Sequence, residues 1–385
     1  MQSFLGLVLL ALSAVATAIP VARSEYETNV ANGLRLLRLE KGAEPVWKSE
    51  DEKHQLKVDG KHFMDVTEVY ERSQKLAAKK SKKVAAKKAS LLCTHLFSDP
   101  DISHQDTVKP LLEKLTTDGL KGYLTDLTAF NNRYYKADTG KDASDFIFNT
   151  ASDLASGKDG ITVSAFNHSF TQYSIIAHID GESDGPLTIL GAHMDSINLR
   201  DERNGRAPGA DDDGSGTVNL LEIFRVLTEA DYAPKTPIEF QWYAGEEAGL
   251  LGSQDIATQY AEDDKEVYAM LQLDMTAYTK PGQDPHVSFM TDNVDTDLTA
   301  FEEKLVDEYL SISYNEGECG YGCSDHASWN ENGYPSSMPF ETTFGSDNPN
   351  IHSADDTVDV DGFSFEQSLE FAKLGLSYIV ELTSA

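Results

Sequence analysis

Five short segments of the sequence carry carboxylates and imidazoles in loops or at the ends of expected strands, where open α/β sheets build their sites. Together they offer two histidines and several acids, a donor set that suits zinc. No catalytic cysteine accompanies them, so metal-assisted chemistry is the best hypothesis. The segments are residues 191–195, 207–216, 245–249, 271–275 and 349–357.

The two histidines of this set are His193 and His352. Alternation along a strand places His193 and Asp195 on the same side, so the carboxylate can hold the second nitrogen of a metal-binding imidazole. Taken alone, a His-x-Asp pair is more often structural or incidental. A lone loop histidine such as His352 is likewise more often a solvated surface group.

Three consecutive acids, Asp211, Asp212 and Asp213, lie in a glycine-rich loop that opens an expected helix. One acid suffices to cap the helix. Adjacent carboxylates repel each other unless cations or solvent compensate. A metal ligand is therefore the alternative to a helix cap flanked by solvated acids.

Three further acids stand at strand ends or inside a strand. The consecutive Glu246 and Glu247 point in different directions, so one can bind a metal while the other accepts a proton. The alternative is a pair of glutamates that favours a helix start. Asp274 interrupts an otherwise apolar run, where a charge is costly unless it is paired or bound to a metal.

From about residue 110 the chain alternates between strand-like and helix-like patterns. The expected strands are residues 170–179, 187–193, 238–244, 268–275 and 287–291. The expected helices are residues 217–229, with Val218, Leu221, Phe224 (or Ile223) and Leu227 on one face, and residues 250–261, 298–310 and 365–382. The alternation predicts one α/β domain over residues 89–385, a three-layer sandwich with a mostly parallel mixed central sheet flanked by helices.

The N-terminal part of the chain predicts export and processing. Residues 1–18 combine a short apolar run with small residues at its end, the pattern of a cleaved signal peptide. Residues 19–88 are expected to be a propeptide, because pairs of lysines at 79–80, 82–83 and 87–88 lie in an Ala/Lys stretch with almost nothing apolar to bury. The alternative is a solvated lysine-rich helix within the mature protein. The expected location is therefore extracellular.

Composition limits the partners. The net charge of −32 repels nucleic acid and anionic membranes, and no apolar run is long enough to span a bilayer. Of the three possible pairings of Cys93, Cys319 and Cys323, we favour Cys319 with Cys323, since two intervening glycines let a tight loop close. Asn167 begins an Asn-x-Ser glycosylation acceptor. We expect a monomer.

The sequence resembles the secreted co-catalytic zinc aminopeptidases, and within them the fungal extracellular leucine aminopeptidases. All five segments occur in the order and spacing of that family, and the run Cys-Gly-Tyr-Gly-Cys-Ser-Asp-His-Ala-Ser-Trp at 319–329 is a further match. The resemblance covers nearly all of the chain after residue 90. It implies two zinc ions per chain, with Asp212 bridging both. His193 and Asp274 complete one zinc site, and Glu247 and His352 complete the other.

The resemblance also implies the reaction, which is removal of N-terminal residues from peptides. A water shared by two zinc ions becomes acidic, Glu246 takes its proton as general base, and Asp195 orients His193. The peptide bond between Asp212 and Asp213 is expected to be cis. A pocket rich in Met and Phe would favour leucine and other apolar first residues; its implied residues are Met275, Met290, Tyr321, Met338, Phe340, Phe344 and Ile351.

Three other functions remain as alternatives. A carboxypeptidase would need a cation to clamp the terminal carboxylate, and after Arg206 the only arginine is Arg225, inside an expected helix. A glutaminyl-cyclase-like transferase would be expected to keep one zinc. A binding module without activity would be expected to lack a ligand or Glu246. The complete set favours an active aminopeptidase.

Overall fold

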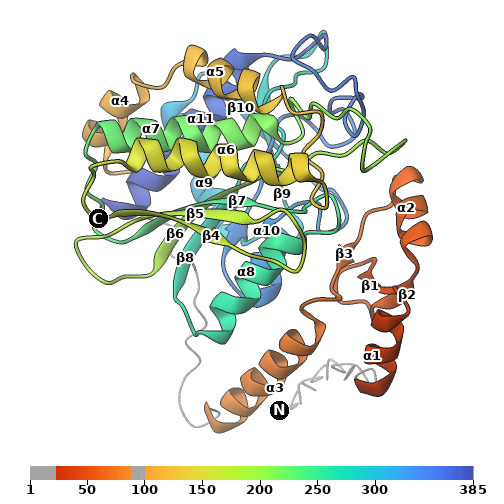
Figure 1. The fold of residues 1–385 in the computed structure, drawn as a ribbon. Coiled ribbons are helices and arrows are strands. Elements are labelled where there is room, and N and C mark those ends of the chain that lie inside the picture. Colours follow the sequence, from red (N-terminus) through yellow and green to blue (C-terminus); the bar gives the residue numbers. More distant parts are fainter. Residues whose placement is uncertain (1–22, 88–96, 98–99, 385) are drawn as a thin grey trace, which may run out of the picture.

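A computed structural model describes residues 23–87, 97 and 100–384 of the chain, and a six-stranded sheet organises most of them (Figure 1). The strand order is β11-β8-β6-β7-β5-β4. The first four of these strands are parallel, and β5 and β4 join antiparallel at one edge. The strands are β4 (Ile161–Phe166), β5 (Ser174–Ile179), β6 (Leu187–His193), β7 (Ile238–Tyr243), β8 (Val267–Gln272) and β11 (Ser336–Ser337).

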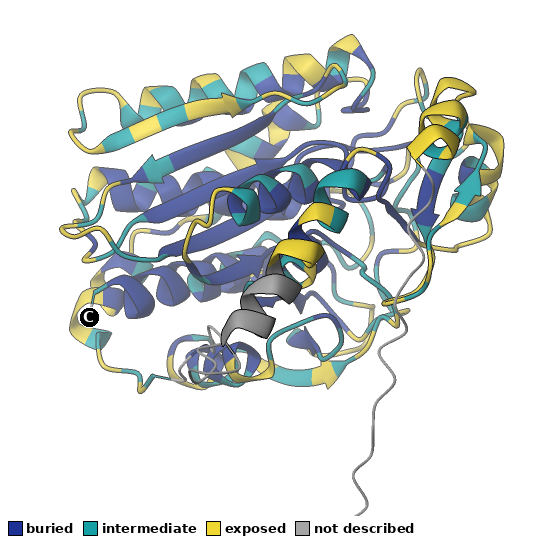
Figure 2. Ribbon diagram, turned by 90° about the horizontal axis from the view of Figure 1, so that it is seen from below, coloured by how far each residue is buried: buried dark blue, intermediate teal, exposed yellow. Residues whose placement is uncertain are grey.

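Helices cover both faces of this sheet, which makes the predicted three-layer sandwich. The larger hydrophobic core joins one face to α4 (Gln105–Leu112), α5 (Thr117–Leu127), α6 (Asp138–Ala155), α7 (Gly214–Glu229), α9 (Thr296–Tyr309) and α11 (Phe365–Thr383). A smaller core joins the other face to α8 (Leu251–Glu262) and α10 (His326–Asn332). Figure 2 shows the buried residues concentrated in the central strands and the helices packed against them.

The residues predicted to share one face of α7 are all buried, but burial extends further round the helix than this face. Leu220 and Val226 are as buried as the predicted residues. The reason is that α5, α6 and α11 all contact α7 while the sheet lies beneath it. A helix enclosed in this way is apolar almost all round.

Two expected strands are shorter than predicted, and several strands are additional, among them β4 and β11 of the central sheet. β8 ends at Gln272, so Asp274 lies in the following loop, where the Met275 N–H bonds to the side chain of Asp213 instead of a neighbouring strand. β5 begins at Ser174, because the preceding residues turn back toward α6, with the Gln172 N–H bonded to the Tyr135 carbonyl. β4 is an edge strand that the predicted set lacks.

A second, three-stranded sheet lies beside the sandwich and carries part of the predicted pocket. Its order is β10-β9-β12, with β9 (His286–Met290), β10 (Ser313–Gly317) and β12 (Pro339–Phe340). β9 and β10 are parallel, and β12 runs antiparallel to β9.

Residues 23–87, called here the N-terminal unit, form a small sheet flanked by helices. An antiparallel sheet of order β2-β1-β3 packs with the helices, and α3 lies against α8 (Figure 1). The elements are α1 (Arg23–Ala31), β1 (Arg35–Arg38), β2 (Val46–Lys48), α2 (Glu50–Val58), β3 (Met64–Asp65) and α3 (Tyr70–Lys87).

As far as Lys87, where the described residues stop, the lysine-rich stretch lies in helix α3. The expected signal peptide and Cys93 lie outside the described residues. Within the part of the chain that the structure describes, no helix is long and apolar enough to cross a membrane.

Candidate active site

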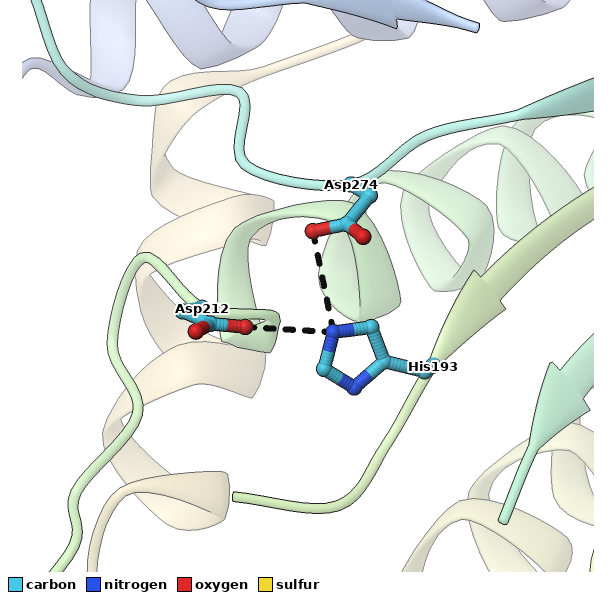
Figure 3. A group of neighbouring side chains, drawn as sticks. All are labelled: His193, Asp212 and Asp274. Atoms are coloured by element: carbon cyan, nitrogen blue, oxygen red, sulfur yellow. Dashed lines mark ion pairs between the residues drawn. The ribbon is translucent and has the colours of Figure 1, made fainter. Parts of the chain in front are cut away.

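Two groups of three possible metal ligands meet at one edge of the central sheet, and they share Asp212. In the first group, His193 Nε2 lies 3.1 Å from Asp212 Oδ1 and 3.6 Å from Asp274 Oδ1 (Figure 3). In the second, His352 Nε2 lies 3.0 Å from Asp212 Oδ2 and 3.1 Å from Glu247 Oε2. Each carboxylate oxygen of Asp212 thus faces one group, which is the arrangement of a bridging ligand.

The fold delivers these ligands from the carboxyl ends of neighbouring strands. His193 is the last residue of β6, Asp274 follows β8, and Glu247 follows β7. Asp212 stands just before α7, and His352 lies in the loop between β12 and α11. All five residues that the sequence singled out as ligands are therefore brought together, three by the ends of parallel strands and two by loops.

The donor set fits zinc. Imidazole and carboxylate are the ligands that zinc accepts beside thiolate. One buried atom of the ligand set, Glu247 Oε1, has no hydrogen-bond partner among the described residues. Burying several carboxylates together is costly unless cations compensate them, and bound metal ions would supply that compensation.

Glu246 belongs to neither ligand group but lines the same cavity. Burial raises the pKa of its carboxyl well above the usual value; Asp325 and Asp274 add to this increase and His193 opposes it. Glu246 and Glu247 thus take different positions, as the sequence predicts. A carboxylate with raised proton affinity beside the ligand groups is suited to accept a proton.

Asp195 connects the first ligand group to the loop of the two glutamates. Its Oδ1 lies 3.4 Å from His193 Nδ1. The same carboxylate accepts hydrogen bonds from the backbone N–H of Glu246 at 2.9 Å and of Glu247 at 3.2 Å. It therefore positions the candidate base as well as the imidazole.

The three consecutive aspartates have three different contacts. Asp213 caps α7 by accepting a hydrogen bond from the Gly216 N–H at 2.9 Å, and it also accepts one from the His193 N–H at 3.0 Å. Asp211 accepts a hydrogen bond from the Ala277 N–H at 3.2 Å. Asp212 is the member left facing both ligand groups. The peptide bond between Asp212 and Asp213 is cis, as the resemblance implies.

Comparisons with known proteins agree with this geometry. Residues 174–371 match the family described as Peptidase family M28. The chain is 38% identical to leucine aminopeptidase 1 of Coccidioides posadasii, covering 99% of each, and 39% identical to leucine aminopeptidase 1 of Aspergillus niger, covering 88% of this chain and 86% of that one. This chain belongs to peptidase family M28. It is a zinc-dependent aminopeptidase, a hydrolase of the leucine aminopeptidase type.

Solved structures support the same fold. The LapA aminopeptidase of Legionella pneumophila has a TM-score of 0.78 and 31% identity, covering 91% of this chain and 94% of that one. The matched share is larger than residues 89–385 alone, so the match extends into the preceding part of the chain. The predicted α/β fold is confirmed.

The predicted M28 pocket lies beside the ligand groups in one cavity of about 360 Å³, called here the cleft. Met290 is fully buried behind this cavity and does not line it. The disulfide between Cys319 and Cys323 is present, and both half-cystines pack against the pocket. The predicted pocket residues that line the cleft are Met275, Tyr321, Met338, Phe340, Phe344 and Ile351.

Arg133 is a site residue that the sequence analysis does not find. Its guanidinium is fully buried and donates hydrogen bonds to the carbonyls of Met194 at 2.6 Å, Pro208, and Gly209 at 2.9 Å. It ties the loop after His193 to the loop before Asp212. No spacing reveals it, because its partners are backbone carbonyls.

Asp356 is a second addition. Its two carboxylate oxygens accept hydrogen bonds from the backbone N–H of Asp211 at 3.2 Å and of Asp212 at 3.1 Å. Burial and the neighbouring acids raise its pKa to about 8. Its sequence signal was available, since it stands four residues after His352 in a segment already singled out.

The cleft also contains residues from the N-terminal unit. Lys57, Lys61, His62 and Phe63 line the same cavity as the ligand groups. The propeptide predicted over residues 19–88 is expected to mask the active site or to assist folding, but no local pattern in the sequence indicates that these four residues would line the cleft.

Proposed function

We propose that the chain is a secreted aminopeptidase that uses two zinc ions to remove leucine and other apolar residues from the free N-termini of peptides. The observation that carries this proposal is the shared Asp212, whose two oxygens face two complete ligand groups beside a cleft lined by Met and Phe. Leucine aminopeptidase 1 of Coccidioides posadasii, a relative over nearly the whole chain, supports the substrate class.

In this mechanism the residues of the chain bind, orient and move protons. Zinc ions held by the five ligands would lower the pKa of water and stabilise negative charge on the peptide oxygen. Glu246 accepts the proton of the attacking water and returns it to the leaving amine. Asp195 keeps His193 and the Glu246 backbone in place through contacts of 3.4 and 2.9 Å.

Specificity follows from the two kinds of surface in the cleft. Met275, Met338 and Phe340 are nearly fully buried, so they offer an apolar pocket to the first side chain. The carboxylates beside the ligand groups attract the free α-ammonium of the substrate. Arg225 pairs with Glu222 and Glu229 on α7, which disfavours a carboxypeptidase with that arginine as its clamp.

The remaining proposals concern export. We assign residues 1–18 to a signal peptide, 19–88 to a propeptide and 89–385 to the catalytic domain, with the enzyme acting as an extracellular monomer. Asn167 is exposed directly after β4, which supports its glycosylation. The neighbouring His168 contacts Asp255 at 3.0 Å and Ser174 at 2.7 Å, so side-chain contacts fix the position of the residue next to the acceptor.

A leucyl-anilide assay combined with metal analysis tests the proposal. The processed enzyme should contain two zinc ions per chain, prefer leucyl over acidic substrates, lose activity with a chelator and regain it with zinc. Activity on C-terminally free but N-terminally blocked peptides would indicate a carboxypeptidase. A single zinc ion per active chain would overturn the two-metal mechanism.

A further inference from the structure

A serine, a histidine and an aspartate form a hydrogen-bonded chain outside the cleft. His168 Nε2 lies 2.7 Å from Ser174 Oγ, and His168 Nδ1 lies 3.0 Å from Asp255 Oδ2. His168 stands in the connection between β4 and β5, Ser174 is the first residue of β5, and Asp255 belongs to α8. These residue types, connected in this order, match those of a nucleophilic triad.

The serine of this chain cannot act as a nucleophile, because it is enclosed. Ser174 is fully buried, and its Oγ accepts a hydrogen bond from the Ala244 N–H at 3.0 Å. A nucleophilic hydroxyl must reach the atom of the substrate that it attacks. The contact with Ala244 points to a different role, since Ala244 stands two residues before Glu246 in the chain.

The loop that carries Glu246 is held on its N–H side by side chains. Four consecutive N–H groups, those of residues 244–247, all donate to side-chain oxygens of other segments. The acceptors are Ser174 Oγ, Gln172 Oε1 and the two carboxylate oxygens of Asp195. The position of the candidate base therefore depends on where these three side chains are held.

Hydrogen bonding assigns the protons of the chain. Among the residues that the structure describes, His168 Nε2 is the only acceptor for the Ser174 hydroxyl, so this nitrogen carries no proton. The proton of the neutral ring is then on Nδ1, which donates to Asp255. Burial alone would raise the pKa of Asp255, but hydrogen bonds and charge from His168 and Arg72 outweigh burial and lower it. A carboxylate at Asp255 thus orients the ring, and the ring orients the hydroxyl.

Close packing restricts both ends of the contact between His168 and Ser174. The His168 side chain is 1% exposed, and its ring stacks on Phe170 with centroids 4.9 Å apart and an interplanar angle of 17°. Gly252 of α8 approaches the serine from the other direction. A Cβ at Gly252 would lie 2.4 Å from the Ala244 carbonyl oxygen and 2.9 Å from Ser174 Oγ, so this approach requires glycine.

We propose that His168 is a positioning residue for the base, because through Ser174 it fixes Ala244 and thereby the loop of Glu246. The proposal rests on the proposed function, since it concerns the base of that reaction. His168, Ser174 and Asp255 all lie within the predicted catalytic domain, so the chain persists whether or not residues 19–88 remain attached. None of the three lines the cleft, so none contacts the substrate.

The experiment uses enzyme isolated from full-chain expression and loaded with zinc. His168→Phe keeps a flat ring beside Phe170 but can neither donate nor accept, whereas His168→Gln keeps a donor and an acceptor. We expect His168→Phe to lower kcat for leucyl-anilide by about tenfold, because a small displacement of a catalytic group is costly. The KM and the zinc content should stay close to wild type, and His168→Gln should recover most of kcat.

His178→Phe is the matched control. His178 lies on the same strand β5 and contacts the buried Glu239 at 3.3 Å, but it does not contact the loop of Glu246. The variant should lower the melting temperature and leave kcat unchanged. Wild-type kcat in His168→Phe, or an equal loss in His178→Phe, would overturn the positioning role. Zinc loss in His168→Phe would also overturn it, because the chain would then act on the ligand Glu247.

Two further measurements do not depend on activity. Nitrogen NMR of the His168 ring should show the proton on Nδ1, and a proton on Nε2 would contradict the assigned chain. Hydrogen exchange of the Ala244 amide should be faster in His168→Phe than in His168→Gln, and equal exchange would overturn the proposal. If zinc-loaded wild type does not hydrolyse leucyl-anilide, the proposed function fails, while these two measurements still decide whether His168 holds the loop.

Discussion

Buried charge is held in two different ways on the two sides of the cleft. On the catalytic side, the carboxylates of the ligand groups outnumber the imidazoles that face them. On the N-terminal side, buried Asp65 pairs with Lys53 at 2.7 Å and with Arg35 at 2.8 Å, and Arg35 also pairs with Glu68 at 3.0 Å, so two cations meet two anions. A balanced set is complete in itself, whereas an excess of buried anions needs added cations. In this protein an excess of buried negative charge lies at the metal-binding site, whereas a set of paired buried charges stabilises the fold.

The largest expected effect separates two adjacent residues on the catalytic side. Glu246→Gln keeps the shape of the side chain but cannot accept a proton, so turnover should fall by about 10²–10⁴-fold. Zinc content should remain normal, because Glu246 faces neither ligand group. Steady-state kinetics and metal analysis of the same preparation test this directly.

Glu247→Ala is the matched change at the next position. It removes a group 3.1 Å from His352 Nε2, so the variant should lose zinc and the stability that zinc binding adds. Equal zinc loss in both variants would show that the two roles are assigned wrongly.

The next prediction tests the buried ion pairs of Asp65. Asp65→Asn leaves Lys53, which is 3% exposed, without its carboxylate partner. Breaking a buried pair in this way should destabilise the N-terminal unit by about 3–5 kcal/mol. Hydrogen exchange of the β1 amides measures the change, and the double variant Asp65→Asn/Lys53→Met should recover most of it.

The same pair predicts a dependence on pH. Burial alone would raise the pKa of Asp65, but Lys53 and Arg35 outweigh burial and hold the pKa at about 2. Since an unperturbed aspartate has a pKa of about 3.9, this stabilisation is present above pH 4 and is lost as the pH falls from about 4 toward 2. The difference in stability between wild type and Asp65→Asn should shrink over that range.

A smaller effect concerns positioning on the catalytic side. Asp195→Asn weakens the support of His193 and of the Glu246 and Glu247 backbone. Groups that orient metal ligands are worth about 10–100-fold in metal affinity or activity. Zinc titration and turnover should therefore both change, and wild-type values in both would remove Asp195 from the mechanism.

The difference between the two sides also explains what the sequence could predict. The five ligands are recognisable because their residue types are unusual at strand ends and in glycine-rich loops. Arg133 could not be found, since its acceptors are carbonyls that any residue supplies. The place of His62 depends on docking against Tyr321, far along the chain, and no local pattern encodes such a contact.

The fold, like the site, was predictable where the residue types along the chain form a recognisable pattern. The buried parallel strands are apolar runs, and they appear close to their expected positions. The sequence does not reveal where β8 ends, because the apolar run continues to Met275. In the structure, the Met275 N–H donates to the Asp213 side chain rather than to a neighbouring strand. The fold of the N-terminal unit could not be predicted, because its few apolar residues, such as Leu36 and Met64, complete their core with residues of the catalytic domain.

The smallest expected effect concerns an exposed pair at the same interface. Lys79 lies 2.8 Å from Asp264, but the side chains are 44% and 60% exposed. Water and salt screen such a pair, so Lys79→Ala should change stability by about 0–1 kcal/mol. Hydrogen exchange of the β1 amides in Lys79→Ala should match wild type, whereas Asp65→Asn should accelerate it. If Lys79→Ala accelerated the exchange equally, surface attraction rather than the buried contacts would stabilise the unit.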